Sequence, residues 1–352
     1  MLLYRFRRRS RRLTLGRYPA LSLAEARGEA RKALALLASG VDPRGVNEPE
    51  RNPEVFATLV DEFVETHCRR HNRATTAVGT ERILRVHFMP SWSKRDLSDI
   101  RKADVLRIID GIVNRNTPSA ANHAFVAIRT FFNWCIGRGY LELSPCQGMT
   151  MPTKLVSRDR VLTDQELTSI WKAGNAIGYP FAAVLQLLIL TAQRRGEVAS
   201  MQWENFDLAG RTWSIPADVA KSGRSHVVPL CSFSTNILLT LPKLEEKWIF
   251  PARSKTNQHY RNFTFAKARV DEISGITNWT LHDLRRTAAT GMAKLGTPPH
   301  VVERILNHRT GSLGGVAGVY NRFGYLTEMR TALEQWSQFV NSLISHGDDH
   351  SR

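Results

Sequence analysis

The chain has 352 residues, 42% of them hydrophobic, and carries a formal net charge of +17 with a sequence pI near 10.3. This length favours two or three domains, and a field this positive attracts polyanions such as nucleic acid. The sequence has no run of about 18 apolar residues and no signal-peptide pattern, so we expect a soluble intracellular protein with no membrane partner. The four cysteines are widely spread and form no CxxC pair, so neither a disulfide framework nor a cysteine zinc site is suggested, and we expect buried, reduced thiols at Cys68, Cys135, Cys146 and Cys231.

The first 50 residues predict a basic β-hairpin followed by a helix. In "LLYRFRRRSRRLTLGRYP", Tyr4 and Phe6 alternate with basic residues around an arginine-rich turn. Ser22 and Glu25 then form a capping-box pattern, and Gly40 stands where that helix would end. The arginines could form a solvated face or a disordered arm, but charge and strand alternation coincide, which favours DNA contact by Arg7, Arg8, Arg9, Arg11 and Arg12.

Residues from about 55 to 147 have helical periodicity throughout, which predicts a small helical bundle. The segment "ANHAFVAIRTFFNWCIGRG" predicts a helix that ends near Gly137 and Gly139. The Pro-, Gly- and Ser-containing stretch that follows is typical of a linker, and a third part begins near Arg158.

The third part opens with a second capping box at Thr163 and Glu166. An apolar run, "FAAVLQLLILT", then predicts a buried helix that is too short to span a bilayer and that leads into polar residues. Arg194 directly follows this run, and Glu197 would lie on the same helical face. The pair is either an ordinary ion pair or a guanidinium held ready for a ligand.

Further basic side chains follow along the chain. Two short strands, Thr212 to Ile215 and His226 to Leu230, are predicted around a loop that carries Lys221 and Arg224. "LHDLRRT" places His282 and Arg285 three positions apart, so they neighbour each other on a helix. Arginine has no lone pair for a metal, so this pair suits a shared anion and we predict no metal site. His308 and Tyr320 follow across a glycine-rich loop.

Together these residues have the chemistry of phosphoryl transfer without a metal or other cofactor. Guanidinium groups match non-bridging phosphate oxygens bidentately, and imidazoles add further donors. A lysine can protonate a leaving alkoxide, and a tyrosine phenol can act as the nucleophile.

The chain resembles the tyrosine recombinases, specifically the integrases of temperate phages and genomic islands. "TAQRRGEV" is similar to the family's first arginine box, and "HDLRRT", "LNH" and "VYNR" resemble its HxxR, LGH and nucleophile segments, in the family's order. Lys221 matches the family's β-hairpin lysine. The resemblance implies catalytic roles for Arg194, Lys221, His282, Arg285, His308 and Tyr320, with Glu197 in support.

The resemblance also implies the domain organisation. We expect a mixed α/β, mostly helical fold. It would comprise a truncated arm-type DNA-binding domain over 1–50, a helical, SAM-like core-binding domain over 55–150, a catalytic domain of helices with a small antiparallel sheet over 158–345, and a polar tail over 346–352.

The mechanism implied by the resemblance is site-specific recombination. Tyr320 would attack the scissile phosphate and form a 3′-phosphotyrosyl link, while Lys221 protonates the departing 5′-oxygen. The expected partners are double-stranded DNA with attachment sites, three further copies in a tetramer on DNA, a DNA-bending host factor and an excision factor. The expected location is the bacterial cytoplasm, at the nucleoid. A type IB topoisomerase-like relaxing enzyme and a non-catalytic DNA-binding regulator are the alternatives.

The chain departs from the family pattern at two glycine positions and in one spacing, and the roles of Tyr325 and of the last helix need separate consideration. Ala192 and Asn307 stand where the family has glycine, and the gap from His308 to Tyr320 is longer than usual. Tyr325 would follow a left-handed Gly324 and pack back on the preceding turn. The last helix has an apolar stripe that could dock on a neighbouring subunit or pack on its own domain: Met329, Leu333, Trp336, Val340 and Leu343.

Overall fold

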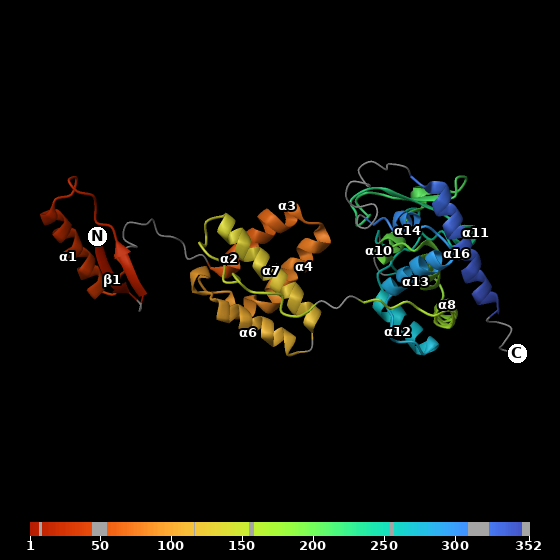
Figure 1. The fold of residues 1–352 in the computed structure, drawn as a ribbon, viewed down its shortest axis with the longest axis horizontal. Helices are drawn as coiled ribbons and strands as arrows, with labels where there is room; N and C mark the ends of the chain where they lie inside the picture. Colours follow the sequence, from red (N-terminus) through yellow and green to blue (C-terminus); the bar gives the residue numbers. More distant parts are fainter. Residues whose placement is uncertain are drawn as a thin grey trace. The chain divides into compact units, whose positions relative to one another are not determined.

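The computed structural model describes residues 1–6, 9–43, 55–115, 117–154, 158–253, 257–308 and 324–346. Contacts divide the chain into two compact units, Met1–Val156 and Ser157–Arg352. Both are mostly helical, and the described strands form two small antiparallel sheets (Figure 1). The fold class predicted from the sequence is confirmed. Among the helices described, none is long and apolar enough to cross a bilayer.

The chain begins with the expected hairpin and helix. Strand β1 (Leu2–Phe6) pairs antiparallel with β2 (Arg9–Leu13), and the helix α1 (Leu23–Ala38) follows. The buried Tyr4 donates a hydrogen bond from its hydroxyl to Asp42 Oδ1 at 2.5 Å, which ties the strand to the segment after α1. The capping box is formed: the Ser22 N–H donates to Glu25 Oε2 at 2.8 Å, and the Glu25 N–H donates to Ser22 Oγ at 3.3 Å.

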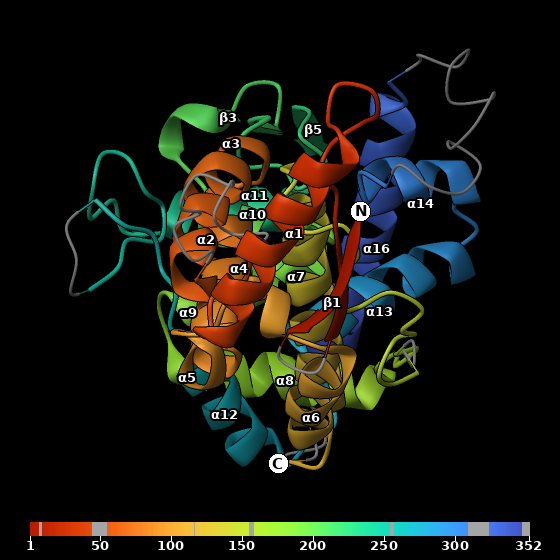
Figure 2. The same cartoon turned by 90° about the vertical axis from the view of Figure 1, so that its left-hand side faces the viewer.

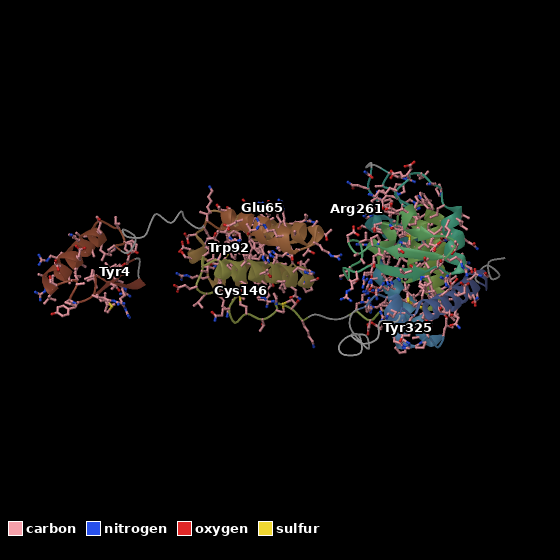
Figure 3. All side chains as sticks on the ribbon, turned by 90° about the horizontal axis from the view of Figure 1, so that it is seen from above. Tyr4, Glu65, Trp92, Cys146, Arg261 and Tyr325 are labelled. Carbon is pink, nitrogen blue, oxygen red and sulfur yellow. The ribbon has the colours of Figure 1, made fainter. Side chains whose placement is uncertain are left out.

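The central part is a helical bundle with an aromatic core. Phe56 packs edge-on against Trp92 and Phe131, with ring centroids 5.2 Å apart in each case. Trp92 and Cys146 are labelled in Figure 3, and burial raises the pKa of the Cys146 thiol to about 11. The elements are α2 (Phe56–Phe63), the π-helix η1 (Val64–Cys68), α3 (Arg69–His71), α4 (Ala74–His87), α5 (Met89–Trp92), the 3₁₀ turn η2 (Leu97–Asp99), α6 (Lys102–Val113) and α7 (Pro118–Gly137).

The C-terminal unit is built around the apolar helix α9, which other helices contact on several sides. Its first helices are α8 (Asp164–Ile177), α9 (Phe181–Thr191) and α10 (Arg195–Ala199). The sheet region contains the 3₁₀ turn η3 (Trp203–Asn205), β3 (Phe206–Asp207), β4 (Thr212–Ile215) and β5 (His226–Pro229). The later helices are α11 (Ser232–Thr240), α12 (Phe263–Ser274), α13 (Leu281–Lys294), α14 (Pro299–Ile305) and α16 (Leu326–His346).

The sheet has the order β3-β4-β5, so it contains one strand more than the sequence predicted. β3 is a two-residue strand, which pairs Phe206 with Trp213 and is too short to give an alternating pattern. The predicted strands are present, and β5 ends at Pro229, one residue earlier than expected.

The apolar stripe of α16 packs on its own domain, which decides between the two alternatives. α13, α14 and α16 lie side by side (Figure 2), and Met329, Leu333 and Val340 are buried. The Trp336 indole is also buried and donates a hydrogen bond to the Ile189 carbonyl of α9 at 2.8 Å. The stripe therefore contributes to the core of the C-terminal unit.

Candidate active site

Arg194 lies at a break between two helices. α9 ends at Thr191, Ala192 adopts a left-handed conformation with φ 54°, and Arg194 caps α10. The predicted i,i+3 pairing of Arg194 with Glu197 is present, but Arg194 is the N-cap of α10 and not a continuation of the apolar helix before it, because the left-handed Ala192 ends that helix. The break turns the Arg194 side chain out of the buried core, and it stays 21% exposed.

The carboxylate of Glu197 holds two of the predicted residues. It is 3% exposed and accepts hydrogen bonds from the Arg194 N–H at 3.0 Å and from Arg194 Nη1 at 3.1 Å. It also accepts the backbone N–H of Lys221 at 3.2 Å. A buried carboxylate is stable only with such partners, so α10 and the loop between β4 and β5 meet at Glu197.

Arg285 is a buried guanidinium on α13 that points toward carbonyl oxygens. It is 3% exposed and donates to the Ala192 carbonyl at 2.6 Å and to the Leu306 carbonyl. Burial, and then the positive charge of Arg194, lower the pKa of Arg285 to about 9, so it stays protonated at neutral pH. Two guanidiniums that repel each other in this way favour a bound anion between them.

His282 lies on the same helix as Arg285 but is exposed. Burial of part of its ring and the charges of Arg286 and Arg285 lower the pKa of His282. Between the two, the fully buried Asp283 accepts hydrogen bonds from Arg158 Nε at 2.8 Å and from Arg286 Nη1 at 2.5 Å. Asp283 thus fixes the first turn of α13, which presents both predicted residues.

His308 follows α14 and contacts an acidic neighbour. Asn307 adopts a left-handed conformation with φ 48°, and His308 Nδ1 lies 3.1 Å from Glu303 Oε2. Burial and the charge of Arg285 lower the pKa of His308, whereas Glu303 opposes that shift. The imidazole is therefore neutral at pH 7.

Four of the predicted residues line one hollow of about 660 Å³: Arg194, Lys221, His282 and Arg285. Arg195 and Lys267 add positive charge to its wall, and the Arg195 guanidinium lies over the Phe263 ring at 4.9 Å. A second hollow of about 660 Å³ is lined by Arg253, Arg261 and Arg269 but by no predicted site residue. We place the candidate site in the first hollow, because four of the predicted catalytic residues line it, whereas His308 does not.

Gln193 and His226 also contribute to the site, although the sequence did not predict them. The carbonyl of Ile305, at the end of α14, accepts Gln193 Nε2 at 2.8 Å and lies 3.1 Å from His226 Nε2. Burial lowers the pKa of His226. The charges of Arg285 and Arg194 also lower it, whereas the charge of Glu197 opposes that shift. No sequence pattern marks a functional histidine at the start of a strand. The one indication for His226 was its position five residues after Lys221.

Some predicted residues lie outside the described part of the chain. These are Tyr320, Arg7 and Arg8, together with the side chains of Arg9 and Arg11. Arg12 and Arg224 are exposed. Within the described ranges, no group of three or more His, Cys, Asp or Glu is placed to hold a metal ion.

Tyr325 is described, and it has a packing role. It carries the left-handed conformation expected one residue earlier, with φ 53°. Its ring lies edge-on to His300, with centroids 5.0 Å apart, and the Arg304 guanidinium lies 5.8 Å from its ring centroid. It is labelled in the C-terminal unit in Figure 3.

Comparison with known families gives three matches along the chain. Residues 1–49 match the model of an arm DNA-binding domain, residues 56–151 that of the phage integrase central domain, and residues 160–317 that of the phage integrase family. The third match includes every described predicted residue of the site and ends before Tyr320.

The individual relatives agree with these matches. The integrase of Shigella phage Sf6 and the prophage integrase IntS of Escherichia coli K12 are each 24% identical to the chain, over 97% of this chain and 90% of theirs. A lambda integrase tetramer bound to a Holliday junction matches with a TM-score of 0.64, 17% identity, and coverage of 89% of this chain and 94% of that chain. A lambda integrase dimer bound to a COC′ core site matches with a TM-score of 0.62 and 18% identity, over 92% of both chains. At such identities the structural matches establish the fold.

Proposed function

The chain belongs to the phage integrase family of tyrosine recombinases, and from that premise we propose how its residues carry out site-specific exchange of DNA strands. The substrate is double-stranded DNA that contains attachment sites, and the reaction integrates a mobile element and excises it again. The observation that carries the proposal is the convergence of Arg194, Arg285, His282 and Lys221 on one hollow.

A phosphodiester suits this hollow chemically. Each guanidinium can donate two parallel hydrogen bonds to non-bridging phosphate oxygens. A bound phosphate would also neutralise the repulsion between Arg194 and Arg285, which lowers the pKa of Arg285 in the absence of an anion. Donors arranged before the substrate arrives stabilise the charge that develops in the transition state.

The nucleophile in this proposal is Tyr320. Its phenolic oxygen attacks the scissile phosphorus and forms a 3′-phosphotyrosyl bond, and the bond from phosphorus to the 5′-oxygen breaks. Lys221 gives a proton to the departing 5′-oxygen. The 5′-hydroxyl of a partner strand then attacks the phosphotyrosyl bond and releases Tyr320, so the bond energy is conserved and no nucleotide hydrolysis is needed.

The two histidines take different roles. His282 is exposed at the hollow and donates a hydrogen bond to the phosphate. His308 is neutral at pH 7, and with its Nδ1–H directed to Glu303 its Nε2 remains an acceptor. His308 is therefore suited to accept the phenolic proton of Tyr320 as well as to lie beside the phosphate.

We assign the remaining parts of the chain to DNA binding and assembly. Residues 1–50 would bind arm-type sites, residues 55–150 would close around the core site together with residues 158–345, and residues 346–352 form a polar tail. Four copies would act on two DNA sites, as the tetramer of lambda integrase on a Holliday junction suggests. A DNA-bending host factor, an excision factor and a cytoplasmic location at the nucleoid complete the proposal.

Recombination between two sites distinguishes this function from its alternatives. DNA that flanks the gene supplies the substrate, because an integrase gene usually lies beside its own attachment site. An integrase joins two such sites and forms a covalent adduct on nicked DNA. A relaxing enzyme would form the adduct without joining sites, and a regulator would bind without forming the adduct.

A further inference from the structure

Asn307 links the His308 segment to the loop that carries Lys221. Its side-chain Nδ2 donates a hydrogen bond to Ser222 Oγ at 3.1 Å, between residues that are 85 positions apart in the chain. The backbone at Asn307 is left-handed, with φ 48°. Asparagine tolerates that conformation better than most side chains, so the backbone explains the residue type, and the hydrogen bond to Ser222 gives the amide a second role at this position.

The hydroxyl of Ser222 is fully used by its neighbours. It donates to the Arg224 carbonyl at 3.4 Å and accepts the Arg224 N–H at 3.4 Å, and Asn307 provides its second donor. A hydroxyl has one donor and two acceptor positions. The Asn307 amide thus completes the set of bonds that hold the turn directly after Lys221.

Lys221 is anchored through its backbone rather than its side chain. Its N–H donates to Glu197 Oε1 at 3.2 Å, and the next residue, Ser222, is held by Asn307. Its ammonium group makes no hydrogen bond with any residue that the structure describes, and its side chain is exposed. A lysine side chain is a flexible four-carbon stem, so the position of its backbone determines which oxygen the ammonium reaches.

We propose that Asn307 is a positioning residue for Lys221 in DNA cleavage. Its amide holds the Lys221 loop against the segment of His308. The position of Lys221, which protonates the leaving 5′-oxygen, is thereby fixed relative to the His308 imidazole beside the phosphate. The proposal rests on the proposed function, in which Lys221 is the acid. A wrongly placed acid costs rate only when the leaving group needs a proton.

The test compares Asn307→Gly with the parent on two nicked suicide substrates. One substrate has the normal 5′-oxygen at the scissile bond, and the other has sulfur at that bridging position, which leaves without a proton. Glycine accepts the positive φ without strain, so this variant removes the amide and keeps the fold. Asn257→Gly is the matched control, since Asn257 is an exposed asparagine with φ 64° and no role in the site.

We expect Asn307→Gly to form adduct about tenfold more slowly on the oxygen substrate, the scale of one lost hydrogen bond. On the sulfur substrate its rate should stay within about twofold of the parent, because proton donation no longer limits the step. Ser222→Ala should slow the oxygen substrate at least as much, because it also removes the two hydrogen bonds to Arg224. The double variant should be no slower than Ser222→Ala, since that single variant has already lost the contact with Asn307. Lys221→Ala should show the same pattern more strongly.

Equal slowing on both substrates would overturn the proposal, because Asn307 would then act on His308 or on DNA binding. An unchanged rate on the oxygen substrate would overturn it as well. Failure of the proposed function looks different: the parent protein itself would then form no adduct on either substrate, and the positioning role would fall with it.

Discussion

The carboxylate of Glu197 accepts the backbone N–H of Lys221 at 3.2 Å while it also holds the Arg194 guanidinium at 3.1 Å. One buried acidic side chain therefore fixes two cationic residues that come from different elements of the fold. The arrangement sets the distance between the group that grips the phosphate and the group that protonates the leaving oxygen.

Replacement of Glu197 should harm stability and cleavage together. In Glu197→Gln one carboxylate oxygen becomes an amide that faces an N–H donor, so the variant should lose about 1–3 kcal/mol of unfolding free energy. Adduct formation should slow on both oxygen and sulfur substrates, because Arg194 is displaced along with Lys221. Thermal unfolding and adduct assays would measure both effects. Glu204→Gln, at an exposed glutamate nearby, is the control, and a Glu197→Gln protein as stable and active as this control would contradict the role of Glu197.

The stability of the C-terminal unit should fall on mild acidification. Burial is the largest cause that lowers the pKa values of His226, His282 and His308 in the folded protein. The unfolded chain then binds protons more readily, so stability is fully present above the ordinary histidine pKa of about 6.5 and is lost as pH falls below it. Asp283, whose folded pKa is also lowered, adds a further loss only below about pH 4.

Scanning calorimetry between pH 7 and pH 5 would measure this loss. His226→Gln keeps a donor near the Ile305 carbonyl but cannot titrate, so its unfolding temperature should depend less on pH than that of the parent. His123→Gln, at an exposed histidine of the first unit, should follow the parent. A His226→Gln protein with the full pH dependence would show that the loss arises elsewhere.

The close contact between α13 and α16 leaves no room for a side chain at Gly291. A methyl group on Gly291 would lie 2.1 Å from the Trp336 ring. Gly291→Ala should therefore destabilise the C-terminal unit by about 1–3 kcal/mol through overpacking. Gly111→Ala in α6, where nothing lies within 4 Å, should instead stabilise the protein by about 0.5–1 kcal/mol. Chemical denaturation would show both effects, and equal stability of Gly291→Ala and the parent would contradict the tight packing of α16.

The N-terminal arginines should matter only for long DNA. Replacement of Arg7, Arg8 and Arg9 by alanine removes three positive charges from the segment of the sequence that follows Phe6. We expect lower recombination on DNA that carries flanking arm sites and nearly normal cleavage of a short core site. Equal losses on both substrates would mean that these arginines act at the core site or in folding.

The sequence predicts contacts correctly where the reactive residues lie on one continuous helix. His282 and Arg285 lie within one continuous helix, so their spacing alone predicted that they are neighbours. The alanine at 192 gives no signal for the break by itself, and the one indication was that the family has glycine at this position. The carbonyls of Ile305 and Leu306, which receive Gln193 and Arg285, come together only in the tertiary structure.

The stripe on α16 shows a similar limit. Helical periodicity predicted correctly that one face of the helix is apolar. It could not predict which surface covers that face, because a stripe of this kind packs equally well on a neighbour or on its own domain. In the structure the stripe packs on its own domain. Trp336 donates a hydrogen bond to the Ile189 carbonyl, and its ring lies directly against Gly291 of α13.

We propose that Tyr320, and not Tyr325, forms the covalent bond to DNA. Tyr325 packs against His300 and Arg304, so Tyr325→Phe should keep its ring contacts and form adduct within a few-fold of the parent. Tyr320→Phe should bind cognate DNA with near-normal affinity and form no adduct, because only the nucleophilic oxygen is removed.

The deciding measurement traps each protein on a nicked suicide substrate, separates the products by denaturing gel electrophoresis and maps the DNA-linked peptide. We expect adduct for the parent and for Tyr325→Phe, none for Tyr320→Phe, and a linked peptide that contains Tyr320. An adduct that persists in Tyr320→Phe and disappears in Tyr325→Phe would show that Tyr325 is the nucleophile.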